Sequence, residues 1–143
     1  MDGWPQVSDA SVDYYYVKKL AYHYIKRSQE PVCLMFDEPK ENRIRLMAAN
    51  DLPKDMDVSY VVKRIGADAD EVVLRGQLKV AADSTVEADV LSIDDGEKEF
   101  YLIEWQYEGK TCKNHYFTNI IDIDYGKYMD ALRKCGMDEF EGF

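Results

Sequence analysis

Apolar and polar residues alternate with a period of two over most of the chain that follows Pro31. Seven segments carry this alternation or a short apolar run, and turn residues separate them roughly every ten positions. The segments are residues 32–36, 43–48, 58–63, 72–80, 85–93, 100–107 and 111–118. Alternation of this kind is typical of strands with one buried face. The pattern therefore predicts a mainly β fold, a β-sandwich of about seven strands and of immunoglobulin-like type.

The chain before Pro31 has the period of a helix instead. Four apolar residues recur there at i, i+3, i+4 and i+7, which is the spacing of one helix face. They are Val17, Leu20, Ala21 and Tyr24. Lys26 and Arg27 follow, and basic residues are favourable near the negative end of a helix dipole. The pattern predicts an N-terminal helix that ends before Pro31 and packs on the sandwich through Leu20 and Tyr24.

The last part of the chain predicts a second, short helix over residues 125–135. Tyr128, Met129 and Leu132 would face inward, and Gly136 suits the C-cap position. Between the strand segments, the run 94–96 reads Asp-Asp-Gly, which is a signal for a tight hairpin between its neighbours.

Charge and composition limit the possible partners. The chain has 143 residues, 46% of them hydrophobic, and a net charge of -10. Nucleic acids and anionic membranes require a basic surface, so neither is expected as a partner. The apolar runs are shorter than the roughly 20 residues of a membrane-spanning helix. The three cysteines are scattered and odd in number, which does not suggest a disulfide framework.

The N-terminal region carries a more specific pattern. Residues 2–15 read DGWPQVSDASVDYY and residues 18–24 read KKLAYHY. This resembles the end of the catalytic barrel in family-two glycoside hydrolases of the β-mannosidase type, where the pattern is approximately N-D-x-W-P, S-[IV]-D-Y-Y and K-[AL]-x-H-Y. Met1 stands in the place of the asparagine, so the chain resembles an expressed fragment or a partial gene product that begins at a barrel strand.

Two short motifs extend this resemblance into the predicted sandwich. Residues 49–51 read Ala-Asn-Asp, and residues 114–117 read Asn-His-Tyr-Phe. Both resemble the immunoglobulin-like domain that follows the barrel in these enzymes. The implied organisation is a barrel-derived strand remnant and helix in residues 1–31, the sandwich in residues 32–121, and a C-terminal helix and tail in residues 122–143.

The resemblance implies a parent enzyme that cleaves terminal β-linked sugars with retention, using two carboxylates and no cofactor. Both catalytic glutamates of the family lie on earlier barrel strands, so we expect no catalytic residue in this chain and no activity of its own. The family tryptophan at the position of Trp4 forms part of the sugar subsite, and Asp2 matches the motif aspartate. The alternative for Trp4 is a packing role. The compartment stays open, and a periplasmic or secreted parent is one option.

Other candidate chemistry is sparse. His23 and His115 have no companion carboxylate or cysteine at ligand spacing, so no metal site is predicted. Tyr101, Trp105 and Tyr107 share one face of a strand, and that face is either core or a surface for sugar stacking or domain packing.

Three functions follow from these observations. The first is a non-catalytic C-terminal accessory domain that packs on the catalytic barrel of its parent and meets carbohydrate only through it. The second is a free-standing carbohydrate-binding module that uses Trp105 and its strand neighbours. The third is a protein-interaction domain.

Overall fold

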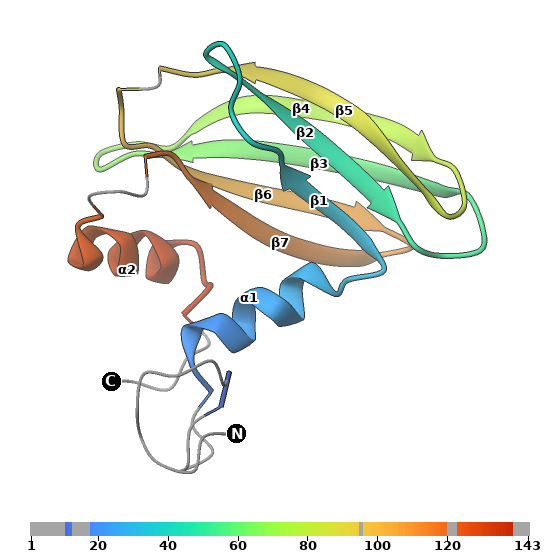
Figure 1. The fold of residues 1–143 in the computed structure, drawn as a ribbon, viewed down its shortest axis with the longest axis horizontal. Coiled ribbons are helices and arrows are strands. Elements are labelled where there is room, and N and C mark those ends of the chain that lie inside the picture. Colours follow the sequence, from blue (N-terminus) through green and yellow to red (C-terminus); the bar gives the residue numbers. More distant parts are fainter. Residues whose placement is uncertain (1–10, 13–17, 95, 120–122, 139–143) are drawn as a thin grey trace.

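Seven strands and two helices make up the part of the chain that the computed structural model describes, which is residues 11–12, 18–94, 96–119 and 123–138 (Figure 1). The strands are β1 (Val32–Phe36), β2 (Arg43–Asn50), β3 (Met56–Ile65), β4 (Glu71–Val80), β5 (Ser84–Ser92), β6 (Phe100–Tyr107) and β7 (Lys110–Phe117). The helices are α1 (Leu20–Ser28) and α2 (Tyr125–Lys134). The predicted strands all exist, and their predicted ends lie within two residues of the observed ends.

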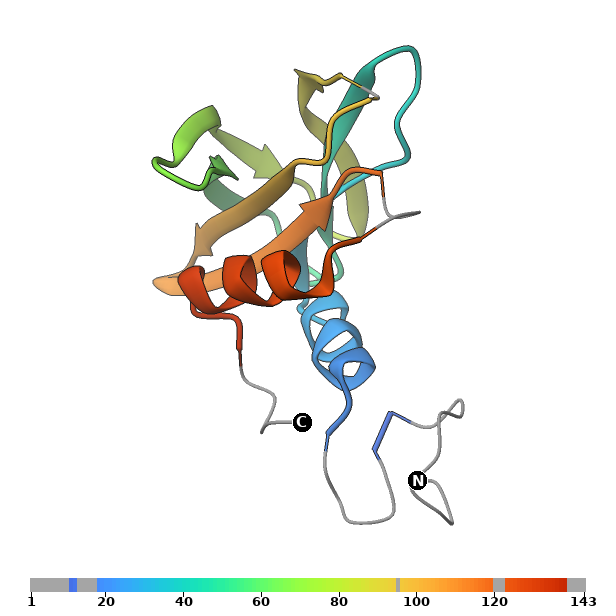
Figure 2. The ribbon, with the colours of Figure 1, turned by 90° about the vertical axis from the view of Figure 1, so that its left-hand side faces the viewer.

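The strands form two antiparallel sheets that pack face to face (Figure 2). One sheet has the order β1-β2-β5, and the other has the order β4-β3-β6-β7. In the constant-type immunoglobulin fold the fourth strand joins the sheet of the first two strands, whereas β4 here pairs with β3. The immunoglobulin-like sandwich is confirmed, with this difference in the placement of its fourth strand.

One predicted hairpin is wrong. Asp94 and Gly96 connect β5 to β6, and these strands belong to different sheets, so the chain crosses the sandwich there. The Asp94 Oδ1 atom accepts a hydrogen bond from the Gly96 N–H at 3.0 Å. This bond closes a local turn, which occurs in connections between sheets as well as in hairpins. A tight hairpin does occur at Glu108 and Gly109, whose φ angles of 46° and 76° match the turn that suits twisted strands.

The main core lies between the two sheets, with Trp105 among its largest buried side chains. The indole Nε1–H of Trp105 donates a hydrogen bond to the Val32 carbonyl at 2.8 Å, which joins β6 to the first strand of the opposite sheet. Beside this bond, the Asn114 Nδ2 atom on β7 donates to the Leu34 carbonyl on β1 at 3.3 Å. These two bonds link the sheets along the β1–β7 edge.

Gly76 is required by a close approach across the sheet. It lies opposite Tyr60 in the β3–β4 pair, and a Cβ atom at this position would lie 2.5 Å from the Tyr60 hydroxyl oxygen. The Tyr60 hydroxyl group donates a hydrogen bond to Asp89 Oδ2 on β5 at 3.0 Å. Burial and the Asp89 carboxylate raise the pKa of Tyr60 to about 12, so the hydroxyl group keeps its proton.

The buried hydrogen bonds of Asn50 can be tested by substitution. It is fully buried at the end of β2, and its Nδ2 atom donates to the carbonyls of Lys54, Val80 and Ala81 at 2.9–3.2 Å. We predict that Asn50→Asp lowers the free energy of unfolding by about 3 kcal/mol or more, because the carboxylate cannot donate and would be a buried charge beside carbonyl oxygens. Urea denaturation at pH 7 measures this change.

Asn42→Asp is the matched control for that substitution. Asn42 is exposed in the β1–β2 connection, so the same chemical change should alter the free energy of unfolding by less than about 0.5 kcal/mol. Equal effects at the two positions would contradict the role assigned to Asn50.

Candidate docking surface

A second hydrophobic cluster covers the outer face of β6 and β7. Phe100 and Leu102 point outward from β6, and α2 buries them under Tyr128, Met129 and Leu132. The helix begins at Asp124, whose side chain accepts a hydrogen bond from the Lys127 N–H at 3.2 Å, as a typical N-cap does. The inward positions predicted for α2 are confirmed, and the first half of β6 is buried on both faces.

Helix α1 lies next to α2, beside the β1–β7 edge of the sandwich (Figures 1 and 2). The prediction that its apolar face packs on the sandwich is only partly right. Leu20 is half-buried against the α2 cluster, but Ala21 is exposed and Tyr24 is 39% exposed. The buried residue of α1 is His23, which periodicity had placed on another face. Val17 lies outside the described residues.

The physical reason is the position of α1. The helix lies at the edge of the sandwich and does not lie flat on a sheet, so among the described residues only part of its circumference has a neighbour. Arg27 reaches the end of the α2 segment, where its Nη2 atom donates to the Met137 carbonyl at 3.2 Å. The apolar side chains on the remaining surface stay exposed.

Three side chains join α1, α2 and the sheet. The hydroxyl group of Tyr24 lies 2.6 Å from His115 Nε2 and also bonds to the hydroxyl group of Tyr128. The Tyr128 hydroxyl group lies 2.9 Å from the same nitrogen of His115. Phe100 stacks on the His115 ring with 5.1 Å between ring centroids. His115 on β7 is therefore the point where both helices attach to the four-stranded sheet.

Burial determines the protonation of this group. His115 is 8% exposed, and its Nδ1 atom has no hydrogen-bond partner. Burial, and to a smaller extent the nearby Arg27 guanidinium, together lower the pKa of His115 to about 4. Burial likewise raises the pKa values of Tyr24 and Tyr128. At pH 7 the three groups are neutral, which suits their apolar surroundings.

This role of His115 was not predicted, because its ring was weighed as a metal ligand and not as a hydrogen-bonding group in a core. The sequence pattern does contain a signal that the His115 ring is buried. Residues alternate along 111–118, so His115 and Phe117 share one face, and Phe100 and Leu102 share a face of the neighbouring strand. A second apolar layer over that face explains both patterns.

The two helices leave an apolar hollow of about 380 Å³ beside this group. It is lined by Leu20, Tyr24, His115, Tyr116, Phe117, Ile123, Tyr125 and Tyr128. Two of these lining residues remain exposed, Tyr125 at 58% and Tyr24 at 39%. Large apolar side chains that remain exposed around one hollow are typical of an interaction surface. We call these residues and the hollow the α1–α2 surface.

The aromatic residues that were candidates for sugar stacking do not lie on the surface. Tyr101, Trp105 and Tyr107 lie in the main core, and Trp105 is 1% exposed. The face that they share is the inner face of the sheet, so it offers no aromatic platform to a sugar in this conformation. The opposite face, with Phe100 and Leu102, is covered by α2. Trp4 and Asp2 lie outside the described residues, so their predicted roles stay predictions.

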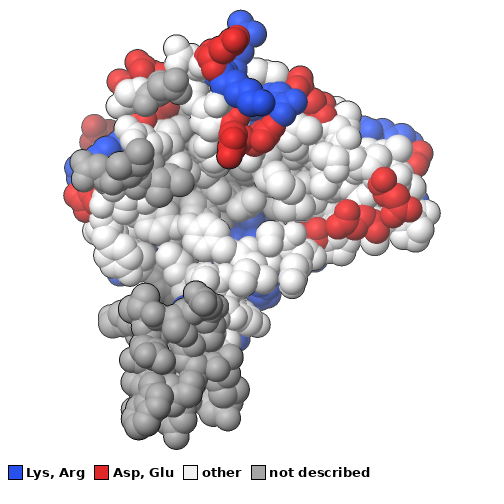
Figure 3. Space-filling view, viewed as in Figure 1, with Lys and Arg blue, Asp and Glu red and all other residues white. Residues whose placement is uncertain are grey.

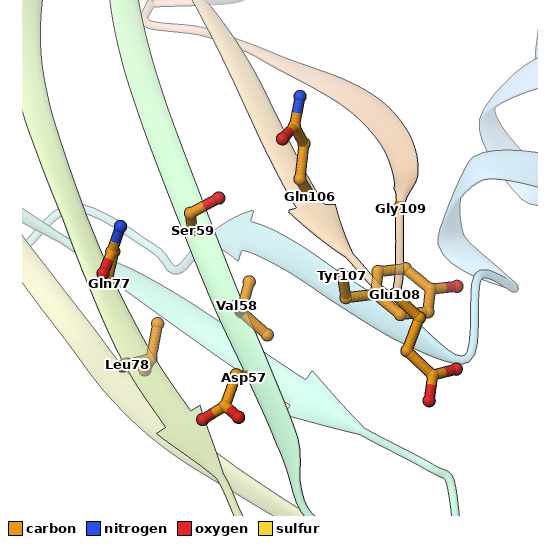
Figure 4. Close-up of a pocket in the computed structure, with 9 residues that line it drawn as sticks. All are labelled: Asp57, Val58, Ser59, Gln77, Leu78, Gln106, Tyr107, Glu108 and Gly109. Atoms are coloured by element: carbon orange, nitrogen blue, oxygen red, sulfur yellow. The ribbon is translucent and has the colours of Figure 1, made fainter.

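A shallow depression of about 490 Å³ lies on the outer face of the four-stranded sheet (Figure 4). Its lining includes Ser59, Gln77 and Gln106, which Figure 4 shows on neighbouring strands. Among the residues that line it, the aromatic one is Tyr107, and its ring is buried. The depression is therefore a polar, solvated surface without a stacking ring.

Within the described residues, no cluster of three or more histidine, cysteine or acidic side chains is placed to hold a metal ion. No described helix is long and apolar enough to cross a membrane. The three cysteines are free and buried.

Comparison with known proteins supports the fold at the level of structure. No protein-family model matches the sequence, and no curated protein matches it. The crystal structure of a β-D-mannosidase from Dictyoglomus thermophilum aligns with a TM-score of 0.59 and 24% sequence identity. The alignment covers 81% of this chain and 15% of the mannosidase chain. The same fold therefore occurs as a small part of that larger chain.

Two other solved structures align less well. They are CsgH from R. palustris and the curli protein CsgC from E. coli, with TM-scores of 0.40 and 0.38 and identities of 11% and 10%. Each alignment covers 59% of this chain, and 87% and 97% of the respective structures. At these scores the likeness carries no weight for fold or function.

The buried state of His115 predicts how stability depends on pH. The unfolded chain binds a proton at His115 near pH 6.5, and the folded chain binds it only near pH 4. Between these values the unfolded state holds more protons, so the contribution of His115 is complete above pH 6.5 and is lost as the pH falls to 4. We expect the loss to approach about 3 kcal/mol, since one pKa unit corresponds to about 1.4 kcal/mol.

His115→Gln is the comparison for this measurement. Glutamine does not titrate, so the variant should lose less free energy of unfolding than the native chain between pH 7 and 4.5, as measured by urea denaturation. Carboxylates titrate equally in both chains and cancel in the difference. Parallel pH profiles would show that His115 is not the group responsible.

The position of the core aromatics predicts weak sugar binding. Titration of the intact chain with mannose or short β-mannan, followed by tryptophan fluorescence or calorimetry, should show no saturation below millimolar concentrations, which corresponds to about 4 kcal/mol or less of binding free energy. Trp105→Ala should instead destabilise the fold by about 3–5 kcal/mol. Micromolar binding that Trp105→Ala abolishes in a folded chain would contradict this expectation.

Proposed function

We propose that this chain is the C-terminal accessory domain of a retaining glycoside hydrolase of the β-mannosidase type, and that it packs on the catalytic barrel of that enzyme. In this proposal residues 1–31 complete the barrel, residues 32–121 form the sandwich, and residues 122–143 form the covering helix and tail. The parent acts on terminal β-linked sugars with two carboxylates that lie outside this chain.

The observation that carries the proposal is the alignment with the D. thermophilum β-D-mannosidase. It includes most of this chain but a small share of the mannosidase chain, as expected for one domain of a larger enzyme. The α1–α2 surface gives further support, because exposed tyrosines beside an apolar hollow are typical of a surface that contacts another protein domain.

The carbohydrate-binding module is less well supported. Such modules present aromatic rings to solvent, where they stack on the apolar face of a sugar. Tyr101, Trp105 and Tyr107 are buried between the sheets, and the depression on the outer face has no exposed ring.

The proposal predicts that the 143-residue chain has no glycosidase activity. Several of its described carboxylates pair with cations, for example Glu104 with Lys63 at 2.8 Å and Glu108 with Lys54 at 2.6 Å. A retaining mechanism instead needs two carboxyl groups about 5 Å apart in a sugar site. Assays with aryl β-mannoside, β-galactoside and β-glucosaminide should give no turnover above a buffer blank.

The reading frame upstream of the Met1 codon provides the complementary test. It should encode a barrel with two glutamates, and the complete polypeptide should hydrolyse aryl β-mannoside. An upstream frame without a barrel would refute the proposal, and so would turnover by the isolated chain that is lost on changing one of its own carboxylates.

A further inference from the structure

The His115 ring occupies a site that disfavours its protonated form. The ring is buried, and its Nε2 atom already bonds to the hydroxyl groups of Tyr24 and Tyr128. Its Nδ1 atom is buried without a hydrogen-bond partner. In a protonated ring both nitrogens carry hydrogen, so the Nδ1–H would be a charged donor without an acceptor, which is costly inside a protein.

The groups around this ring supply no negative charge among the described residues. From α1 the ring meets the hydroxyl group of Tyr24 and the cation of Arg27, and from α2 it meets the hydroxyl group of Tyr128. The β6 side chain that stacks on it is Phe100, which is uncharged. The hollow beside it is lined by aromatic and aliphatic side chains without a carboxylate. On the face shown in Figure 3, charged side chains gather mainly at the top and right, and the middle is largely uncharged.

Helices α1 and α2 are linked to each other, so they can leave the sheet together. The Tyr24 hydroxyl group bonds to that of Tyr128, and Leu20 packs on the cluster that α2 covers. The Arg27 Nη2 atom donates to the Met137 carbonyl, just after α2, at 3.2 Å. We call α1 and α2 together the helical layer.

The sandwich beneath the helical layer has a core of its own. The two hydrophobic clusters are separate, and the larger one lies between the sheets. The bonds that join the sheets, from Trp105 to Val32 and from Asn114 to Leu34, involve neither helix. Opening of the helical layer would therefore expose the outer face of β6 and β7 and leave the core between the sheets in place.

An ion pair between α2 and the β3–β4 connection limits the pH range in which His115 acts alone. The Lys134 Nζ atom donates to Asp70 Oδ1 at 2.7 Å and to the Gly66 carbonyl at 3.0 Å. Lys134 holds the pKa of the Asp70 carboxyl group below its usual value of 3.8, so this pair is still charged at pH 4.5. Between pH 7 and 4.5 the histidine titrates while this ion pair persists.

We propose that the helical layer is a pH-sensitive element, in which proton uptake by His115 favours a state with α1 and α2 released from β6 and β7 and with the sandwich still folded. The proposal goes beyond the proposed function and does not depend on it, since every group involved lies within this chain. The closed state binds the proton less readily than the open state, so opening becomes more favourable as the pH falls below 6.5.

Amide hydrogen exchange of the 143-residue chain, followed by NMR and corrected for intrinsic exchange rates, tests the proposal. At pH 7 the hydrogen-bonded amides of α1 and α2 should share one opening constant, at least about tenfold larger than that of the β3 and β6 amides. From pH 7 to 4.5 this constant should rise about 50-fold, given pKa values of 6.5 in the open state and about 4 in the closed state. Helix amides that are protected as strongly as those of β3 and β6 would mean that the chain opens only as a whole, and would overturn the proposal.

His115→Gln identifies the group that takes up the proton. Glutamine does not titrate, so this variant should lose most of the rise between pH 7 and 4.5, even if its helices already open more often at pH 7. His23→Gln is the matched control, because His23 is the other histidine of the chain and is buried on α1, and this variant should keep the rise. A rise that persists in His115→Gln, or that His23→Gln alone abolishes, would overturn the proposal.

Discussion

The contact between Trp105 and the first strand is the interaction on which the rest of the structure depends. A β-sandwich is stable only if its two sheets exclude water from their facing surfaces, and Trp105 is among the largest side chains in that space. Its indole N–H would be costly to bury without an acceptor, and the Val32 carbonyl provides one at 2.8 Å. Burial and hydrogen bonding therefore both hold β6 of one sheet against β1 of the other.

The helical layer depends on that arrangement. With β1 held against β6 and β7, α1 lies beside the β1–β7 edge, next to the outer face where α2 covers Phe100 and Leu102. His115 then lies between the two helices, and its neutral ring accepts or donates hydrogen bonds with a tyrosine from each. The same burial that depresses the pKa of His115 ensures that these bonds form between neutral groups at pH 7. The sheet and the helices thus form two connected cores.

The surface that remains uncovered links this architecture to function. Exposed tyrosines lie beside an apolar hollow there, next to a helix that is cationic within an acidic chain. The fold also occurs within a much longer β-D-mannosidase chain. In the proposed function, this helical side of the domain faces the catalytic barrel.

The sequence by itself determined the local structure. A period of two or a short apolar run indicated all seven strands, because alternate side chains of a strand point to opposite faces, and the spacing of Tyr128, Met129 and Leu132 indicated the buried face of α2. Sequence could not decide which strands pair, because pairing depends on contacts far apart in the chain. The Asp-Asp-Gly run 94–96 looks like a hairpin but connects two sheets.

Only the tertiary structure decided which faces are exposed. Alternation places Tyr101, Trp105 and Tyr107 together, but burial of that face follows from the opposite sheet, which lies elsewhere in the sequence. The periodicity of α1 marks an apolar stripe, yet the edge position of the helix leaves Ala21 and Tyr24 of that stripe exposed and buries His23. Periodicity predicts which residues share an apolar face. Whether that face is buried depends on the packing of elements that lie far apart in the sequence.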